Sequence, residues 1–145
     1  MSAGGDTGIR ERGRPELIQP PGWKRPSGYS NGAAATGRVL CVAGQIGWDP
    51  ATGRFESDLL AEQARRALEN VAAVLRAGGA EPAHVVRLTW YVTDRAAYQA
   101  ARRELGAAYR ELFGAHYPAM SVVFVSGLVE ERALVEIEAT AVVPA

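Results

Sequence analysis

The segment ALVEIEATAVV, residues 133–143, decides the fold, because apolar side chains recur at every second position along it. Successive side chains of a strand point to opposite faces, so this alternation predicts a strand with one face in a core. The opposite face carries Glu136 and Glu138 beside Leu134, Thr140 and Val142. The apolar face carries Val135, Ile137, Ala139, Ala141 and Val143.

Working outward from this strand, the chain alternates between the two periodicities of regular structure. Residues 85–93 and 119–125 show strand character. A helix with an apolar face is expected between Ser57, as its N-cap, and the pair Gly78-Gly79. A second is expected from the N-cap Asp94 to Gly114. The two apolar faces carry Leu60, Ala64, Ala67, Leu68, Val71 and Leu75 in the first helix, and Tyr98, Ala101, Leu105, Ala108 and Leu112 in the second.

The start of the chain predicts less regular structure. Residues 32–36 and 39–43 flank Gly37-Arg38, which indicates a β-hairpin, and residues 49–53 carry the residue types of a turn. The predicted order is ββαβαββ, an α+β fold with two helices on one face of the sheet. Residues 1–25 are interpreted as a flexible extension and residues 26–145 as a single domain.

The second face of the sheet is semi-apolar, because the strand at 85–93 adds Val85, Thr89 and Tyr91 to it. A domain of this size should not leave such a face in water, so we expect it to pack on other subunits. Glu136 would then lie at a subunit interface.

Composition excludes several classes of protein. The 145 residues are 48% hydrophobic and 22% charged, and 16 basic residues balance 16 acidic ones, so neither nucleic acid nor an anionic membrane is an expected partner. The N-terminus has no secretory pattern, and the single cysteine, Cys41, fits a reducing compartment, so a cytoplasmic location is expected. One lysine, two histidines and one cysteine match no zinc spacing or Schiff-base site, and no nucleotide-binding motif occurs. No metal or cofactor is therefore expected.

Five fragments resemble the reactive-intermediate deaminase family (RidA/YjgF, older label L-PSP). In order they are SGYSNG (27–32), AGQIG (43–47), QARRALENV (63–71), YPAM (117–120) and VEIEA (135–139). The resemblance covers residues 26–144 and implies a chorismate-mutase-like fold, a homotrimer with a central barrel, and ligand clefts between subunits. Deaminating members hydrolyse enamines and imines to ketones and ammonia without metal or cofactor.

The resemblance also implies site residues. Glu136 matches the glutamate that positions water, Tyr29 matches a tyrosine of the cleft, and Gly44 and Gln45 lie in the turn whose backbone contacts the ligand. Tyr117 also belongs to the matching segments, and Trp48, just past the turn, has pocket and packing roles equally open. His116 is interpreted as a solvated loop residue rather than a proton shuttle, and Arg87 as an ion-pair partner of Glu138 rather than a substitute cation.

One position departs from the family pattern. Active deaminases carry an arginine that clamps the substrate carboxylate, and this chain has Met120 there, followed by Val122 and Phe124 on the same side of the strand. Losing a charge-assisted pair removes on the order of 1.5–3 kcal/mol of binding. We therefore expect an apolar pocket, and poor activity on simple 2-imino acids.

The predicted function is a cofactor-free hydrolytic deaminase of an enamine or imine. An aminomuconate-like or other ring-derived enamine suits the apolar pocket better than a simple 2-imino acid. The alternative is a non-catalytic small-molecule-binding or regulatory trimer. The nuclease activity that the older family label implies is disfavoured, because the chain lacks a basic stripe interleaved with aromatic residues.

Overall fold

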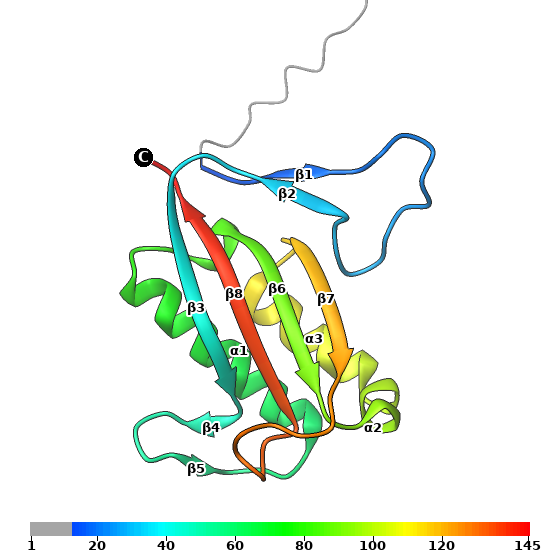
Figure 1. Cartoon of the computed structure of the whole chain (residues 1–145), viewed down its shortest axis with the longest axis vertical. Coiled ribbons are helices and arrows are strands. Elements are labelled where there is room, and N and C mark those ends of the chain that lie inside the picture. Colours follow the sequence, from blue (N-terminus) through cyan, green and yellow to red (C-terminus); the bar gives the residue numbers. More distant parts are fainter. Residues whose placement is uncertain (1–12) are drawn as a thin grey trace, which may run out of the picture.

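The computed structural model describes residues 13–145, and its centre is a four-stranded sheet with the strand order β3-β8-β6-β7. The strands are β3 (Arg38–Ile46), β6 (Val85–Val92), β7 (Ala119–Phe124) and β8 (Val135–Val143). β8 pairs antiparallel with both β3 and β6, and β6 pairs parallel with β7. The C-terminal strand thus lies inside the sheet, as Figure 1 shows in red.

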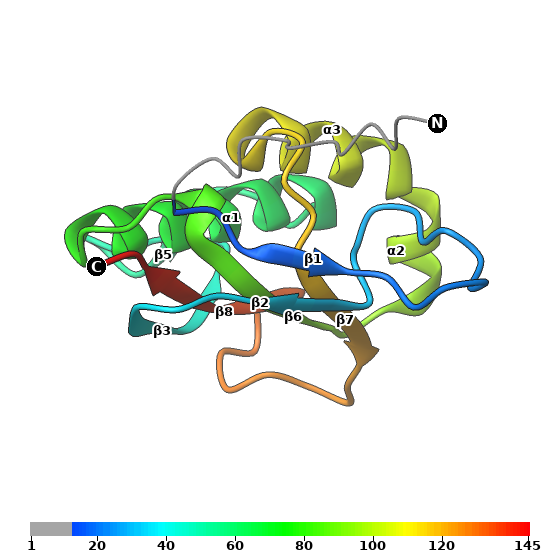
Figure 2. The same ribbon diagram turned by 90° about the horizontal axis from the view of Figure 1, so that it is seen from above.

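The helices α1 (Leu60–Ala77), α2 (Arg95–Ala100) and α3 (Arg102–Phe113) cover one face of this sheet, and the other face is left open (Figure 2). A short 3-10 turn, Pro82–His84, leads into β6. The core between helices and sheet includes Leu68, Leu88 and Ile137, each fully buried. The predicted α+β class, with helices on one face of the sheet, is confirmed.

The predicted hairpin at 32–43 is wrong. β2 (Gly32–Ala34) pairs with β1 (Glu16–Ile18), and β3 pairs with β8 instead. The chain changes direction at Gly37, between β2 and β3. A side chain at this position would collide with the Val143 carbonyl, so the turn requires glycine. β1 lies inside the segment expected to be a flexible extension, and residues 1–12 of that segment lie outside the described residues. The division at residue 26 stays a prediction.

Each helix prediction needed one correction, at the N-cap of the first helix and in the middle of the second. Ser57 does not cap α1: its hydroxyl accepts a hydrogen bond from the Leu59 N–H, and the N-cap position is Leu59 itself. Asp94 does cap α2, because its carboxylate accepts from the Ala97 N–H at 3.0 Å. The second helix is interrupted at Ala101, whose ψ of 4° is not helical, and it ends as expected at Gly114. The turn at 49–53 is confirmed, and it joins β4 (Trp48–Asp49) to β5 (Arg54–Phe55).

Two bulges shape the sheet. In β3 an extra residue lies between Val42 and Gln45, and in β6 the register with β8 shifts between Val85 and Arg87. The second bulge turns Val85 into the core, where it is fully buried. The assignment of Val85 to the open face was therefore wrong, because strict alternation does not survive a bulge.

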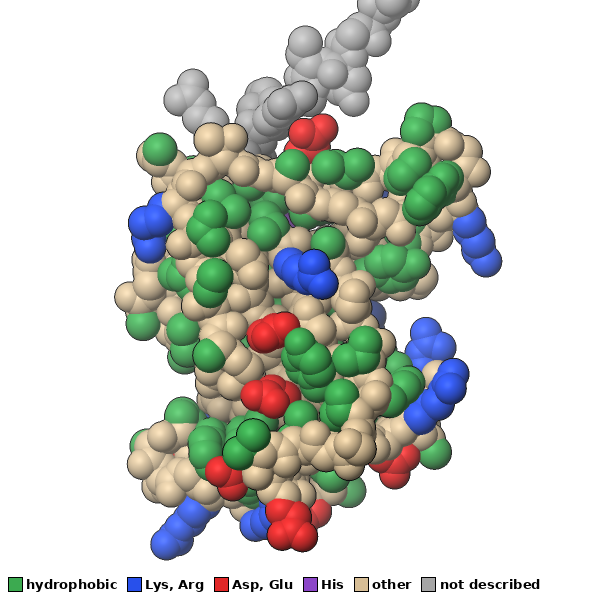
Figure 3. Space-filling view, viewed as in Figure 1, with side chains coloured by type: hydrophobic (Ala, Val, Ile, Leu, Met, Phe, Trp, Pro, Cys, Tyr) green, Lys and Arg blue, Asp and Glu red, His purple; other side chains and the backbone are tan. Residues whose placement is uncertain are grey.

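The open face of the sheet is mixed in character. Figure 3 looks onto it and shows acidic side chains and a basic one among apolar side chains near its middle. Val39 is 63% exposed and Val123 40% exposed, and Cys41, two residues after Val39 on β3, is exposed as well. Among residues 13–145, no helix is long and apolar enough to cross a membrane.

Candidate functional site

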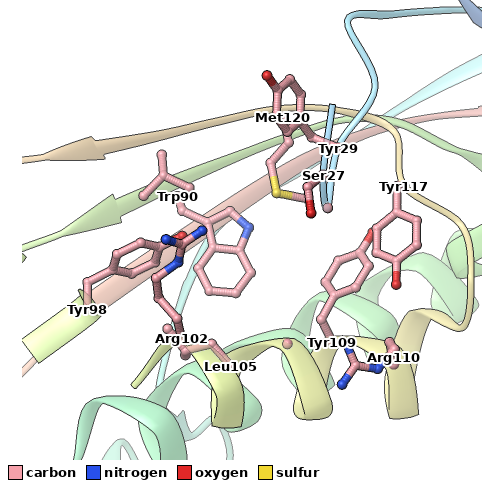
Figure 4. Close-up of a pocket in the computed structure, with 13 residues that line it drawn as sticks. Ser27, Tyr29, Trp90, Tyr98, Arg102, Leu105, Tyr109, Arg110, Tyr117 and Met120 are labelled. Atoms are coloured by element: carbon pink, nitrogen blue, oxygen red, sulfur yellow. The ribbon is translucent and has the colours of Figure 1, made fainter. Parts of the chain in front are cut away.

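A cavity of about 500 Å³ lies between α3, β7 and the loop at residues 27–29. This size is within the usual range for small-molecule sites. Figure 4 shows side chains from the helix, the sheet and the loop converging on it. It is lined by Ser27, Gly28, Tyr29, Trp90, Tyr98, Arg102, Leu105, Gly106, Tyr109, Arg110, Tyr117, Met120 and Val122.

The loop that bears Tyr29 is attached to the start of β7. The Ser30 N–H donates to the Pro118 carbonyl at 3.0 Å, and the Ser30 hydroxyl donates to the Tyr117 carbonyl. Residues 28–32 read GYSNG and so match the G-x-S-x-G pattern of serine hydrolases. That pattern marks a nucleophile only on a strand-to-helix turn, whereas Ser30 precedes strand β2. Its hydroxyl therefore holds the loop in place.

One wall of the cavity is a stack of aromatic rings. Tyr109 lies 5.4 Å from Tyr117 and 5.1 Å from Phe113, ring centre to ring centre, with nearly parallel planes. The Tyr109 hydroxyl donates to the His116 carbonyl at 2.6 Å, and burial raises the pKa of Tyr109 far above its ordinary value. Tyr109 therefore serves as a neutral, fixed wall rather than a base.

His116 is buried beneath this wall, which corrects its interpretation as a solvated loop residue. Its Nε2 lies 2.7 Å from the Val85 carbonyl, so the imidazole donates there. Burial lowers the pKa of His116, although the hydrogen bond to Val85 opposes that shift. The ring is absent from the cavity lining, so His116 supports the fold and shuttles no proton into the cavity.

A second cluster lies on the open face of the sheet, at the bulge in β3. The Glu136 carboxylate covers Gly44, and a Cβ added to Gly44 would clash with Oε1 of Glu136. Glycine is therefore required there for the carboxylate to lie against the backbone. The bulge takes Ala43 and Gly44 out of register with β8, and such bulges recur beside active sites. A shallow hollow of about 320 Å³ is lined by Gly44, Tyr91, Val125, Gly127, Leu128, Glu136 and Glu138.

Tyr91 connects the two glutamates of this hollow. Its hydroxyl donates to Oε1 of Glu138 at 2.7 Å. That hydrogen bond, together with burial and the charges of Glu138 and Glu136, raises the pKa of Tyr91. Within the described chain Glu138 is the partner of Tyr91, and an ion pair of Glu138 with Arg87 in the expected barrel stays a prediction. Glu136 is left as the carboxylate that faces Gly44.

The predicted site residues thus fall on opposite sides of the sheet. Tyr29, Tyr117, Met120 and Val122 line the helix-side cavity, whereas Gly44 and Glu136 line the open-face hollow. Parallel register pairs Met120 with Leu88 and Val122 with Trp90, which places both on the core side of β7. Within one chain the sheet itself separates the two groups.

The other three predicted residues line neither hollow. Phe124 packs edge-on against Tyr98 at 5.7 Å and lies under the Arg95 guanidinium. Gln45 donates from Nε2 to the Ala43 carbonyl at 3.0 Å, within its own bulge. Trp48 packs against Phe55 in the β4–β5 ribbon. Their predicted contact with a ligand stays a prediction that one chain alone does not test.

Residues of the cavity that the sequence did not single out are Trp90, Arg102, Gly106, Tyr109 and Arg110. The alternating pattern of its strand predicts that Trp90 is an ordinary core residue. The helical pattern predicts that the two arginines lie on the solvent-exposed face of a helix. The one usable signal was their spacing, since Arg102, Gly106 and Arg110 recur at intervals of four and share a helix face. Among residues 13–145 no group of three or more His, Cys, Asp or Glu side chains is placed to hold a metal ion.

The fold, the helix-side cavity and the open-face hollow define the class of protein. It is a small α+β domain whose sheet has helices on one face and the Glu136 carboxylate on the other. The chain belongs to the family described as Endoribonuclease L-PSP, whose model matches residues 23–143. The resemblance to RidA/YjgF proteins is therefore confirmed.

Relatives and solved structures agree with this placement. A RutC family protein of Pyrococcus horikoshii is 35% identical over 87% of this chain and 96% of its own length. A human 2-iminobutanoate/2-iminopropanoate deaminase is 31% identical over 76% of this chain and 77% of its own. The structure of the Rid-family protein YyfB from Yersinia pestis matches with a TM-score of 0.79 at 33% identity, covering 90% of this chain and 99% of that one.

Proposed function

We propose that this protein is a cofactor-free hydrolase that deaminates an enamine or imine. The observation that supports this most directly is the Glu136 carboxylate lying over Gly44 beside a bulge in β3. The name of the human relative, a 2-iminobutanoate/2-iminopropanoate deaminase, points to the same chemistry. The family description names an endoribonuclease, but 16 basic residues balanced by 16 acidic ones favour a small molecule over RNA.

The proposed reaction needs one base and one water. An enamine tautomerises to the imine, and Glu136 takes a proton from water as the water oxygen bonds to the imine carbon. The nitrogen of the protonated imine takes the displaced π electrons, so a neutral carbinolamine forms. Glu136 then returns the proton to that nitrogen, and the carbon–nitrogen bond breaks as the hydroxyl group releases its own proton to water, so a ketone and ammonia leave. A positioned carboxylate contributes about 10²–10⁴-fold to such proton transfers.

We propose that the working site forms between subunits of a homotrimer. Glu136 and Gly44 on the open face of one subunit would meet the cavity of a neighbour that holds Tyr29, Tyr117, Met120 and Val122. The exposed apolar side chains Val39 and Val123 on the open face support an assembled state, because water-exposed apolar patches of this kind mark interfaces. Light scattering tests it: a mass near three chains supports the proposal, and a mass near one chain contradicts it.

The substrate is proposed to be larger and more apolar than 2-iminopropanoate, for example an aminomuconate-like or other ring-derived enamine. Met120 and Val122 put thioether and alkyl groups where a carboxylate clamp would be needed. Ammonia release, coupled to glutamate dehydrogenase, should be measured on imines generated in place from a panel of amino acids and aminodienes. Release from none of them, with ligands still bound, would favour the non-catalytic binding trimer.

A further inference from the structure

The cavity contains a buried donor with no acceptor in the protein. Trp90 is only 4% exposed, and its Nε1 is the one buried side-chain nitrogen or oxygen without a hydrogen-bond partner among residues 13–145. Figure 4 shows the indole nitrogen directed toward the space between Met120 and Tyr109. Buried donors are almost always paired, so an unpaired one facing a cavity indicates where a ligand acceptor belongs.

The charged side chains of the cavity wall carry one sign. Arg102 and Arg110 line the cavity, and no Asp, Glu or Lys does. Both arginines are exposed, and neither forms an ion pair with a described acidic residue. The charged side chains of the wall and its unpaired buried N–H, from Trp90, are therefore all donors. Such a wall favours an anionic ligand rich in acceptors.

The lack of a side chain at Gly106 lets the Arg110 guanidinium lie against α3 at the cavity wall. Gly106 lies between Arg102 and Arg110 on the same helix face, and a Cβ there would already come within 3.3 Å of Nη1 of Arg110. Glycine inside a helix costs about 1 kcal/mol relative to alanine, so open space at this position has a stability cost. In Figure 4 Arg102 rises from α3 beside Trp90 and Tyr98, whereas Arg110 lies along the helix below Tyr109.

The remaining wall is built for a ring. Tyr98, Trp90, Tyr109 and Tyr117 present aromatic surface, and Leu105 and Val122 present alkyl groups. Aromatic side chains hold planar ligands through offset stacking and edge contacts. A volume of about 500 Å³ also exceeds what a three- or four-carbon acid fills.

We infer that this cavity binds an aromatic carboxylate, with the ring among the tyrosines and a carboxylate oxygen accepting from Nε1 of Trp90. Arg102 and Arg110 attract the negative charge from the rim. The inference rests on the proposed function, because it takes the aromatic carboxylate to be part of the substrate that is deaminated. The aromatic ring is the side chain of that substrate, and the carboxylate is its acid group. It places carboxylate recognition on Trp90 and α3, away from position 120, where Met120 offers no charge.

The test is binding, measured on the full chain without turnover. Protein labelled with ¹⁵N in its three tryptophans gives three indole N–H signals, assigned with the variants Trp23→Phe, Trp48→Phe and Trp90→Phe. The ligands are 3-phenylpropanoate, its neutral match 3-phenylpropanamide, and propanoate, which lacks the ring. We expect 3-phenylpropanoate to move the Trp90 indole signal downfield and to bind at least about tenfold more tightly than either control.

Variants locate the binding site. Arg102→Gln/Arg110→Gln should weaken 3-phenylpropanoate binding by about tenfold or more, because two charge-assisted contacts are lost. Arg103→Gln, on the same helix but outside the lining, is the matched control and should change binding by less than about twofold. Trp90→Phe should weaken binding about fivefold by removing the donor. Gly106→Leu should abolish binding by filling the cavity, at a melting temperature no lower than that of the wild type, because leucine favours the helix more than glycine does.

Three results would overturn the inference: an unmoved Trp90 signal at saturating 3-phenylpropanoate, equal affinity for acid and amide, or a preference for propanoate. Failure of the proposed function looks different, since a shifted Trp90 signal without ammonia release from any imine leaves the binding site standing. Rapid release from small aliphatic imines, unaffected by Gly106→Leu, would keep the deaminase and remove this ligand class.

Discussion

The two sides of the central sheet have opposite chemistry. The open face presents Glu136 and Glu138 over a shallow hollow beside the β3 bulge. The helix-side cavity is deeper and aromatic, with Arg102 and Arg110 as its charged groups. One side offers proton acceptors, and the other offers donors and apolar surface.

This difference shows what each half lacks. A carboxylate in a shallow hollow activates water but holds no substrate, whereas an aromatic cavity with arginines at its rim binds a substrate but offers no base. The sheet keeps the two apart within one chain. In the proposed trimer, a second copy therefore brings the open face of one chain to the cavity of another.

The largest effect is expected at Glu136. Glu136→Gln keeps the size and hydrogen-bonding reach of the side chain but removes the base, so turnover of an accepted imine should fall about 10²-fold or more. Glu138→Gln is the matched control, because its amide oxygen still accepts from Tyr91. Ammonia release, light scattering and melting temperature should be measured for both. Equal activity of the two variants would remove Glu136 from the mechanism.

A gain of function is expected at the cavity. Met120→Arg adds a cation where the wild-type wall has a thioether, and should raise ammonia release from 2-iminopropanoate by about tenfold at low substrate concentration. Recovery should stay partial, because Val122 still narrows the cavity. Met120→Leu, which adds no charge, should leave the rate unchanged. If Met120→Arg releases ammonia no faster than the wild type, the substrate carboxylate is bound away from position 120 or is not bound at all.

A smaller effect concerns acid stability on the helix side. Because burial lowers the pKa of His116 in the folded state, the unfolded chain binds the extra proton more readily. Stability contributed by neutral His116 is therefore present above its ordinary pKa, about 6.5, and is lost as the pH falls below it. Melting temperatures from pH 8 to pH 5 should fall less steeply in His116→Gln than in the wild type. Parallel slopes would show that other groups carry the acid sensitivity.

Most of the fold was predictable because strong periodicity coincides with burial. The alternation in β8 and the apolar stripe of α1 each match fully buried residues such as Ile137 and Leu68. The errors came from long-range pairing: Gly37-Arg38 looks like a local turn, yet β3 gains a nine-residue partner in β8 and β2 pairs with β1. The residue types of a turn do not reveal that strands distant in the sequence compete with the neighbouring strand as pairing partners.

The site was predictable only in part. Family resemblance identified Glu136 and Met120, but sequence order gave no sign that they lie on opposite faces of the sheet. Trp90 and Arg110 escaped notice because a core tryptophan and a surface arginine look ordinary until a cavity joins them. Val85 was misplaced since a bulge reverses the face of every residue before it.

The central claim is that each working site takes Glu136 from one subunit and the cavity from another. The direct test mixes two inactive variants, Glu136→Gln and Gly106→Leu, by co-expression with different tags and purification of hybrid trimers. The purified hybrids should regain about a third of wild-type ammonia release, because one of the three subunit interfaces in each hybrid trimer combines an intact glutamate with an intact cavity. Hybrids as inactive as either parent trimer would contradict the account.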